Sequence, residues 1–201
     1  MNMINNEQNN GLDTVIKGLG DINFSSKFLE KRSIFLWGAV MDDTAEQVVN
    51  RLFYLDMKEQ GKPITFYINS PGGSVTAGLA IYDTMKLIKS PVRTVCMGLC
   101  ASMASILLSG GEKGSRFIFP NAEVMIHQPS IGGHFQDKAS NLEITARQIN
   151  KTKTLTAKIL SENCGKDFDT VLQDIENDYW MDSNEALQYG IVDKMLDKLE
   201  W

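Results

Sequence analysis

The segment Gly98-Leu-Cys-Ala-Ser102-Met-Ala places a serine where a predicted strand runs into an apolar helix. At such a junction, backbone N–H groups and the helix dipole favour developing negative charge, which suits a nucleophile in acyl transfer. A serine there is also a common helix N-cap, and for an isolated serine that is the more frequent explanation. Nucleophilic chemistry at Ser102 therefore requires a base and an orienting acid elsewhere in the chain.

The chain has two histidines, and one is better placed to act as a base. His127 ends a predicted strand and precedes a proline turn, and the carboxyl ends of strands in α/β sheets are where sites form. His134 lies beside glycines and is typical of a surface loop. The acid that orients an imidazole must be a carboxylate, and spacing alone leaves Asp174 and Asp178 as equal candidates.

A second glycine-bearing turn, Ser70-Pro-Gly-Gly73, also follows a predicted strand. Its glycines permit positive φ and leave backbone N–H groups uncovered, although a tight strand-to-helix turn explains an isolated example equally well. Neither this turn nor Gly110–Gly114 supplies the GxxxxGK[ST] pattern of a phosphate-binding loop. We therefore expect no nucleotide site and no cofactor in this chain.

Metal and disulfide chemistry have little support in the composition. Two histidines exclude a His-rich metal cluster, and the three cysteines form no CxxC pair. We interpret Cys96, Cys100 and Cys164 as reduced core thiols, and expect no metal.

Short β-prone runs alternate with helical patterns, which predicts an α/β fold with mainly parallel strands. The predicted strands are 34–37, 64–68, 92–97, 116–119, 124–127 and 191–192. The predicted helices are 43–60, 77–88, 102–109, 140–163, 167–173 and 183–189. Asp43 and Ser140 are predicted to begin their helices with capping boxes. The 140–163 helix has a thin apolar stripe, which indicates either a solvent-bridging helix or one that a partner chain covers.

The chain contains no composition break or repeat that would mark a second domain. We expect residues 1–20 to form a mobile arm and residues 21–201 to form a single domain. Its 20 basic and 25 acidic side chains give a net charge of -5, which argues against nucleic-acid or anionic-membrane partners. No apolar run approaches the ~20 residues that span a bilayer, and the N-terminus lacks the order of a secretory signal. We expect a cytoplasmic protein.

Five groups of segments, in this order and at these separations, resemble the ClpP family, the proteolytic subunit of the ATP-dependent Clp protease. They are Tyr67-Ile-Asn-Ser-Pro-Gly-Gly73 with Ala80-Ile-Tyr-Asp-Thr84; Gly98-Leu-Cys-Ala-Ser102-Met103; Phe119-Pro-Asn-Ala122 with Met125-Ile-His-Gln-Pro129; Asp174-Ile-Glu-Asn-Asp178; and Glu185-Ala with Tyr189-Gly190. The resemblance covers most of the chain, about residues 31–196. It implies a crotonase-like α/β fold with a protruding strand-helix handle at about residues 130–163.

The resemblance also assigns roles within a serine peptidase. Ser102 matches the family nucleophile, His127 the general base and Asp178 the orienting acid, which stands just before an aromatic pair. The backbone N–H groups of Gly73 and Met103 match the oxyanion hole.

The family resemblance extends to substrate and partner surfaces. Two segments would pair with the substrate backbone as added strands. They are Gly73-Ser74-Val75-Thr76 and Ile131-Gly132-Gly133. The positions that match the family's docking clefts for a separate AAA+ unfoldase are Tyr67, Leu87, Phe117 and Phe119. The family forms heptameric rings stacked in pairs around a closed chamber, and ATP is used by the unfoldase.

Three departures from the family pattern bear on assembly. The stretch before Phe28 does not match the usual N-terminal pattern, and the turn after Pro129 is longer than in the commonest members. Asn177 stands where the family commonly has an arginine that ties the two rings together, and an Asn cannot form the bidentate ion pair of an Arg. These departures suggest a second-type subunit that works beside a paralogue. The alternatives are a latent or structural subunit of a mixed assembly and, more remotely, a crotonase-type acyl-CoA enzyme.

Overall fold

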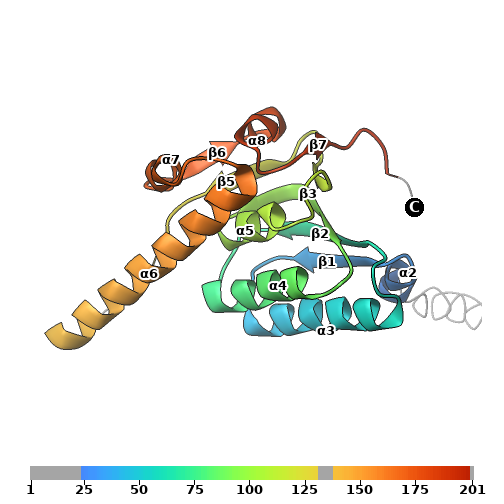
Figure 1. Ribbon diagram of the computed structural model, residues 1–201, viewed down its shortest axis with the longest axis horizontal. Coiled ribbons are helices and arrows are strands. Elements are labelled where there is room, and N and C mark those ends of the chain that lie inside the picture. The colour runs from blue at the N-terminus through green and yellow to red at the C-terminus, as the bar shows by residue number, and fades with distance from the viewer. Residues whose placement is uncertain (1–23, 131–137, 200–201) are drawn as a thin grey trace, which may run out of the picture.

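A computed structural model describes residues 24–130 and 138–199 of the chain (Figure 1). The arm expected at residues 1–20 lies outside the described residues. The elements are, in chain order, α2 (Phe24–Glu30), β1 (Ser33–Trp37), α3 (Asp42–Lys58), β2 (Ile64–Ser70), α4 (Val75–Leu87), β3 (Val92–Ala101), α5 (Met103–Ser109), β4 (Arg116–Ile118), β5 (Glu123–Ile126), α6 (Ala139–Cys164), α7 (Phe168–Asp174), β6 (Tyr179–Met181), α8 (Ser183–Tyr189) and β7 (Lys194–Met195). The predicted α/β class is confirmed.

The strands form one mainly parallel sheet. Its main path is β1-β2-β3-β4-β7, with β5 parallel to β3 and β6 antiparallel to β5. The last strand predicted, at residues 191–192, is wrong: Ile191 and Val192 are buried in the connection that precedes β7. β6 was not predicted, because three residues carry no readable alternation of apolar and polar side chains.

Three helices cover one face of the sheet. Helices α3, α4 and α5 pack in series, with α3 on β1 and α5 on β2 and β3. Successive side chains of a strand point to opposite faces of the sheet, so only alternate residues face these helices. In β1, Ile34 and Leu36 are buried, while Phe35 points to the other face. The core therefore lies between the helix layer and this face.

The starts of two helices differ from the predicted capping boxes. Helix α3 begins one residue earlier, with Met41 as N-cap, and the Thr44 hydroxyl accepts a hydrogen bond from the Met41 N–H. Helix α6 has Lys138 as N-cap with no side-chain cap bond, so the box predicted at Ser140 does not form. Both helices exist as predicted, because burial of an apolar stripe outweighs the choice of cap.

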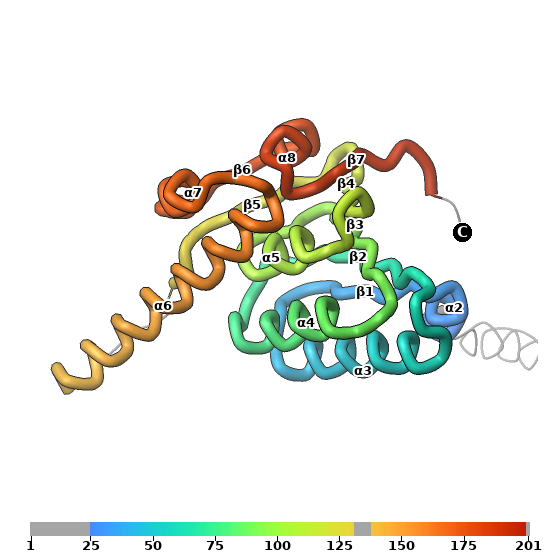
Figure 2. The backbone as a smooth tube through the Cα atoms, in the orientation of Figure 1, coloured from blue at the N-terminus to red at the C-terminus, as the bar shows by residue number. Residues whose placement is uncertain are grey.

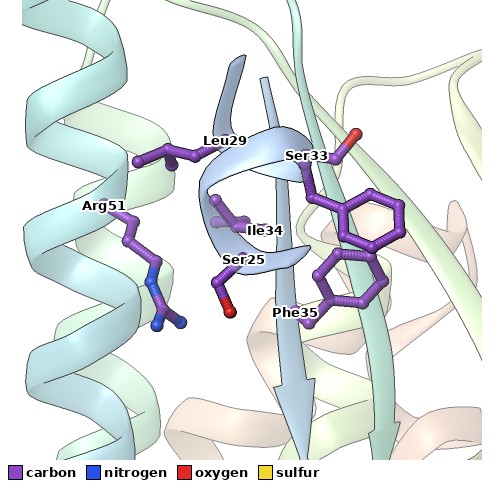
Figure 3. A pocket seen from close by; sticks show the side chains of 7 residues that line it. Ser25, Leu29, Ser33, Ile34, Phe35 and Arg51 are labelled. Atoms are coloured by element: carbon purple, nitrogen blue, oxygen red, sulfur yellow. The ribbon is translucent and has the colours of Figure 1, made fainter. Parts of the chain in front are cut away.

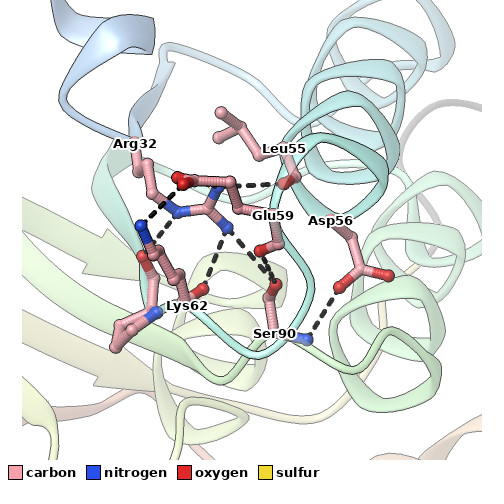
Figure 4. A network of polar contacts seen from close by, with 7 residues as sticks. Arg32, Leu55, Asp56, Glu59, Lys62 and Ser90 are labelled. Atoms are coloured by element: carbon pink, nitrogen blue, oxygen red, sulfur yellow. Dashed lines mark hydrogen bonds and ion pairs between the residues drawn. The ribbon is translucent and has the colours of Figure 1, made fainter.

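Arg32 ties the start of the sheet to the end of α3 (Figure 4). Its guanidinium donates to the carbonyl oxygens of Leu55, Lys62 and Pro63 at 2.9–3.1 Å. Arg32 has φ 55°, an uncommon conformation for a side-chain-bearing residue, and these bonds hold it there. Arg32 thereby fixes the amino end of β1, which lies at the opposite end of the parallel strands from Ser102.

Helix α6 projects from the body of the chain (Figures 1 and 2). Its buried residues, Thr156, Ala157, Ile159 and Leu160, all lie in the C-terminal half. Farther out, Leu142 and Ile144 are exposed. The thin apolar stripe predicted for this helix is thus covered by the chain only at the base of α6. Among the described residues, the structure contains no helix long and apolar enough to cross a membrane.

Candidate active site

Strand β3 changes partner along its length, and this change directs its end toward the site. Its first half pairs with β4 and its last residues, Leu99–Ala101, pair with β5. The change occurs at Gly98, where φ is 86° and the register with β2 slips. The Asn69 side chain fixes the bend by accepting a hydrogen bond from the Leu99 N–H at 3.0 Å. The carboxyl ends of β3 and β5 consequently lie side by side.

Ser102 follows β3 in a conformation that L-residues rarely adopt. Its φ and ψ are 55° and -124°, and its N–H donates to the Met125 carbonyl of β5 at 2.9 Å. Ser102 is the N-cap residue of α5, but its side chain makes no cap hydrogen bond. The hydroxyl oxygen lies instead 2.9 Å from Nε2 of His127. Strain of this kind persists only where the surroundings impose it, and it is common at reactive residues.

His127 is brought to Ser102 by β5, which ends one residue before it. Its Nδ1 lies 3.0 Å from Oδ1 of Asp178, which directly precedes β6. Because β6 runs antiparallel to β5 with Ile126 opposite Tyr179, the next position in that register sets His127 against Asp178. An ionised Asp178 accepts from Nδ1–H, which leaves Nε2 free to accept the proton of the Ser102 hydroxyl.

The structure separates the two acidic candidates. Asp174, at the end of α7, accepts a hydrogen bond from the Tyr189 hydroxyl at 2.9 Å. Burial and this contact with Asp174 raise the pKa of Tyr189.

The second histidine, His134, lies outside the described residues.

The turn at Gly72 and Gly73 lies against the start of α5. A Cβ added to Gly72 would be 2.7 Å from Cβ of Ser102 and 2.8 Å from the Met103 nitrogen, so no side chain fits there. Gly73 forms a bridge to Val40, whose carbonyl accepts from the Ser74 N–H at 2.8 Å. The turn that carries the exposed Gly73 backbone thus lies beside Ser102 and the Met103 nitrogen.

The predicted substrate segments are only partly seen. Ser74 is the N-cap of α4, and Val75 and Thr76 lie in its first turn. The extended pairing predicted for Val75 and Thr76 is therefore not available in this structure, since a helical turn presents no strand edge. The second segment, Ile131, Gly132 and Gly133, lies outside the described residues.

Two of the four predicted docking residues share a face of the sheet, opposite α3, α4 and α5. Tyr67 and Phe117 occupy one row across the strands, both paired with Val95. The ring of Phe35 extends this row by stacking on Tyr67 at 5.0 Å. Leu87 is 83% exposed at the end of α4, and Phe119 packs against the core.

Beside this row lies the pocket of Figure 3, of about 250 Å³. Its lining residues are Ser25, Phe28, Leu29, Ser33, Ile34, Phe35 and Arg51. The lining comes from α2, β1 and α3, so this pocket is separate from the strand ends that carry Ser102.

Residues 24–130 and 138–199 contain no group of three or more His, Cys, Asp or Glu side chains placed to hold a metal ion. The thiols of Cys96, Cys100 and Cys164 are free. Burial raises the pKa of Cys164 to about 11 and that of Cys100 well above its ordinary value.

Three supporting residues were not identified from the sequence. Asn69 and Val40 fix the bend at Gly98 and the turn at Gly73 respectively. Gln128 donates through its backbone and side chain to the carbonyls of Ile175 and Glu176 at 2.7 and 2.9 Å, just before Asp178. In the sequence, only the glycines at these places indicate the bend and the turn, since each glycine marks a close approach or a positive φ.

Comparisons with known proteins agree with this geometry. A family model described as Clp protease matches residues 17–199. The "ATP-dependent Clp protease proteolytic subunit" of Streptococcus mutans is 44% identical over 189 residues, which cover 94% of this chain and 96% of that relative. These similarities support the peptidase interpretation over an acyl-CoA enzyme.

Proposed function

The chain belongs to the Clp protease family, whose members are serine endopeptidases, and we propose that Ser102, His127 and Asp178 form its catalytic triad. The observation that carries the proposal is the continuous contact from Asp178 to His127 to Ser102, at 3.0 and 2.9 Å. In this mechanism Ser102 Oγ attacks a peptide carbonyl while His127 takes its proton and returns it to the leaving amine. Asp178 holds the tautomer and stabilises the imidazolium.

The tetrahedral oxyanion is stabilised by the backbone N–H groups of Gly73 and Met103. The approach of the turn at Gly72 and Gly73 to Ser102 and to the Met103 nitrogen supports this role. The close approach of Gly72 keeps the two groups near one another. No cofactor takes part in this chemistry, and ATP is used by a partner AAA+ unfoldase that docks on the face carrying Tyr67 and Phe117.

The working assembly consists of heptameric rings stacked in pairs. Exposed apolar side chains on two separate surfaces support such an assembly, because a lone chain would leave them in water. One surface, at β1 and α3, comprises Trp37, Met41, Phe53, Tyr54 and Met57; the other, on α6, comprises Leu142, Ile144 and Leu155.

The exposed Asn177 favours a second candidate, a subunit of a mixed assembly that requires a paralogue. Asn177 lacks the charge of the arginine common at this position, so a purely homomeric double ring loses one tie between its rings.

The test is hydrolysis of a short fluorogenic peptide and of a folded, degron-tagged protein by the purified chain. We expect peptide cleavage without ATP, protein cleavage only with an unfoldase and ATP, and neither with Ser102→Ala. Activity that is absent alone but arises with a paralogue, and depends on Ser102, would favour the mixed assembly. Peptide cleavage retained in Ser102→Ala would contradict the proposed triad.

A further inference from the structure

Lys153 forms an ion pair that joins α6 to the segment carrying Asp178. Its Nζ contacts Oε1 of Glu176, and its side chain is 20% exposed. The other two ion pairs of α6 in the described part of the chain, Arg147–Glu143 and Lys158–Glu162, stay within the helix and are largely exposed. Lys153 is therefore placed differently, because its partner Glu176 lies outside α6, in the segment between α7 and β6.

Glu176 belongs to a short link, residues 175–178, between α7 and β6. Ile175 is fully buried, and Gln128 binds the carbonyls of Ile175 and Glu176 from the β5 side. The Lys153 ammonium holds the same link from the α6 side. The link is thus fixed between the residue that follows His127 and the base of α6.

Asp178 depends on this link for its position. Its side chain is 60% exposed, and its carboxylate forms a hydrogen bond with His127. A carboxylate so exposed is not confined by packing, so the backbone of residues 175–178 decides whether it meets the imidazole.

We propose that Lys153 is a positioning residue for the triad, acting through Glu176 to hold the link that presents Asp178 to His127. This inference rests on the triad proposed above. It makes the docking of α6 on the body of the chain a condition for a well-aligned acid. Among the described residues, Lys153 forms its ion pair with Glu176 and none with the three triad side chains.

The first test uses Lys153→Met, which keeps an apolar stem of similar length and removes the charge. We expect kcat for a short peptide to fall roughly tenfold with KM within about twofold, because misalignment affects the chemical step more than binding. Glu176→Gln should give the same loss, and the double variant no more than either single one. Lys153→Arg keeps a cation at this position and should retain the activity of the parent. Lys158→Met, which removes the pair within α6, is the matched control and should behave as the parent.

The split between kcat and KM separates positioning from a loss of substrate binding. A variant that only weakened substrate binding would raise KM and leave kcat unchanged. An unchanged kcat in Lys153→Met, or a loss of activity in Lys153→Arg as large as in Lys153→Met, would overturn the proposal.

Hydrogen–deuterium exchange gives a readout that does not depend on activity. In Lys153→Met we expect amides of residues 175–181 to exchange about fivefold faster, with residues 64–70 unchanged. Peptide cleavage that persists in Ser102→Ala would refute the proposed triad, while the exchange of residues 175–181 would still test the role of Lys153. Unchanged exchange in Lys153→Met, with cleavage that depends on Ser102, would refute the role of Lys153 and leave the triad standing.

Discussion

Asp174 and Asp178 lie four residues apart, and each binds a different aromatic partner. Asp178 contacts Nδ1 of His127 at 3.0 Å, whereas Asp174 accepts from the Tyr189 hydroxyl at 2.9 Å. Between them the chain leaves α7 and enters β6, so the two carboxylates point to separate surroundings. One aspartate is available for catalysis and the other secures α7 to α8.

These two positions give a direct comparison of isosteric changes. We expect Asp178→Asn to lower kcat roughly 10³–10⁴-fold, because the amide no longer holds the productive tautomer. Asp174→Asn should leave kcat within about twofold and lower stability by about 1 kcal/mol, because the amide oxygen accepts from the Tyr189 hydroxyl more weakly than the carboxylate does. Peptide hydrolysis and urea unfolding measure the two effects. Equal losses of activity in both variants would contradict the assignment of the acid.

Gly72 offers a test of the turn beside Ser102. A Cβ there would clash with Cβ of Ser102 and the Met103 nitrogen, and φ is already 89°. We expect Gly72→Ala to lower kcat at least about 100-fold by displacing the turn. Gly61→Ala is the matched control, since Gly61 has φ 80° and no atom within 4 Å of an added Cβ. It should cost about 1–2 kcal/mol of stability and leave kcat unchanged. Equal kcat values for Gly72→Ala and Gly61→Ala would show that the turn at Gly72 is not needed for activity.

Asp193 should make folding sensitive to acid. Burial opposes ionisation of Asp193, but hydrogen bonds from Arg116 and the Gly114 N–H outweigh it and hold the pKa of Asp193 below its ordinary value of 3.8. A lowered folded pKa contributes stability above the unfolded value, and this contribution is lost as pH falls below about 3.8 toward the folded pKa.

We expect Asp193→Asn to lose about 3 kcal/mol at pH 7, because it leaves the buried Arg116 charge unpaired. The exposed pair of Lys62 with Glu59 is the control, and Lys62→Met should cost less than about 1 kcal/mol. Urea unfolding at fixed chain concentration, at pH 7 and pH 3.5, measures both. The stability of Asp193→Asn should decrease less than that of the parent when the pH is lowered from 7 to 3.5. An equal decrease in both would contradict the role of Asp193.

The free thiols should be slow to react in the native chain. With the pKa of Cys164 near 11, only about one thiol in a thousand is ionised at pH 8, and Cys100 is fully buried. We expect iodoacetamide at pH 8 to leave Cys96, Cys100 and Cys164 unmodified over minutes, and to modify all three in denaturant. Intact mass reads out the count. Rapid modification of one thiol in the native chain would show that its burial is wrong.

The sequence predicted the parts of the site that depend on strand ends. Ser102 and His127 both follow strands with readable apolar runs, so their meeting at one edge of a parallel sheet could be expected. The N-cap alternative for Ser102 could not be rejected from sequence, because it depends on the direction of one hydroxyl group.

The choice of the acid and the residues that support the site could not be predicted from local sequence patterns. Asp178 meets His127 through the register of β5 with a three-residue strand that begins 53 positions after β5 ends, and no local pattern encodes that pairing. The resemblance to a family supplied the assignment that spacing could not. Val40 acts through its backbone groups, and Gln128 acts through its backbone as well as its side chain, so side-chain types alone do not reveal these roles.

The central claim is that Ser102 is an aligned nucleophile, and its most direct test is active-site labelling. The purified chain is incubated with a fluorophosphonate probe, and intact mass is measured beside a Ser102→Ala variant while the assembly is sized. The account predicts one adduct per chain that is lost in the variant. An adduct that persists in Ser102→Ala, or no adduct in a correctly sized ring, would contradict an aligned Ser102.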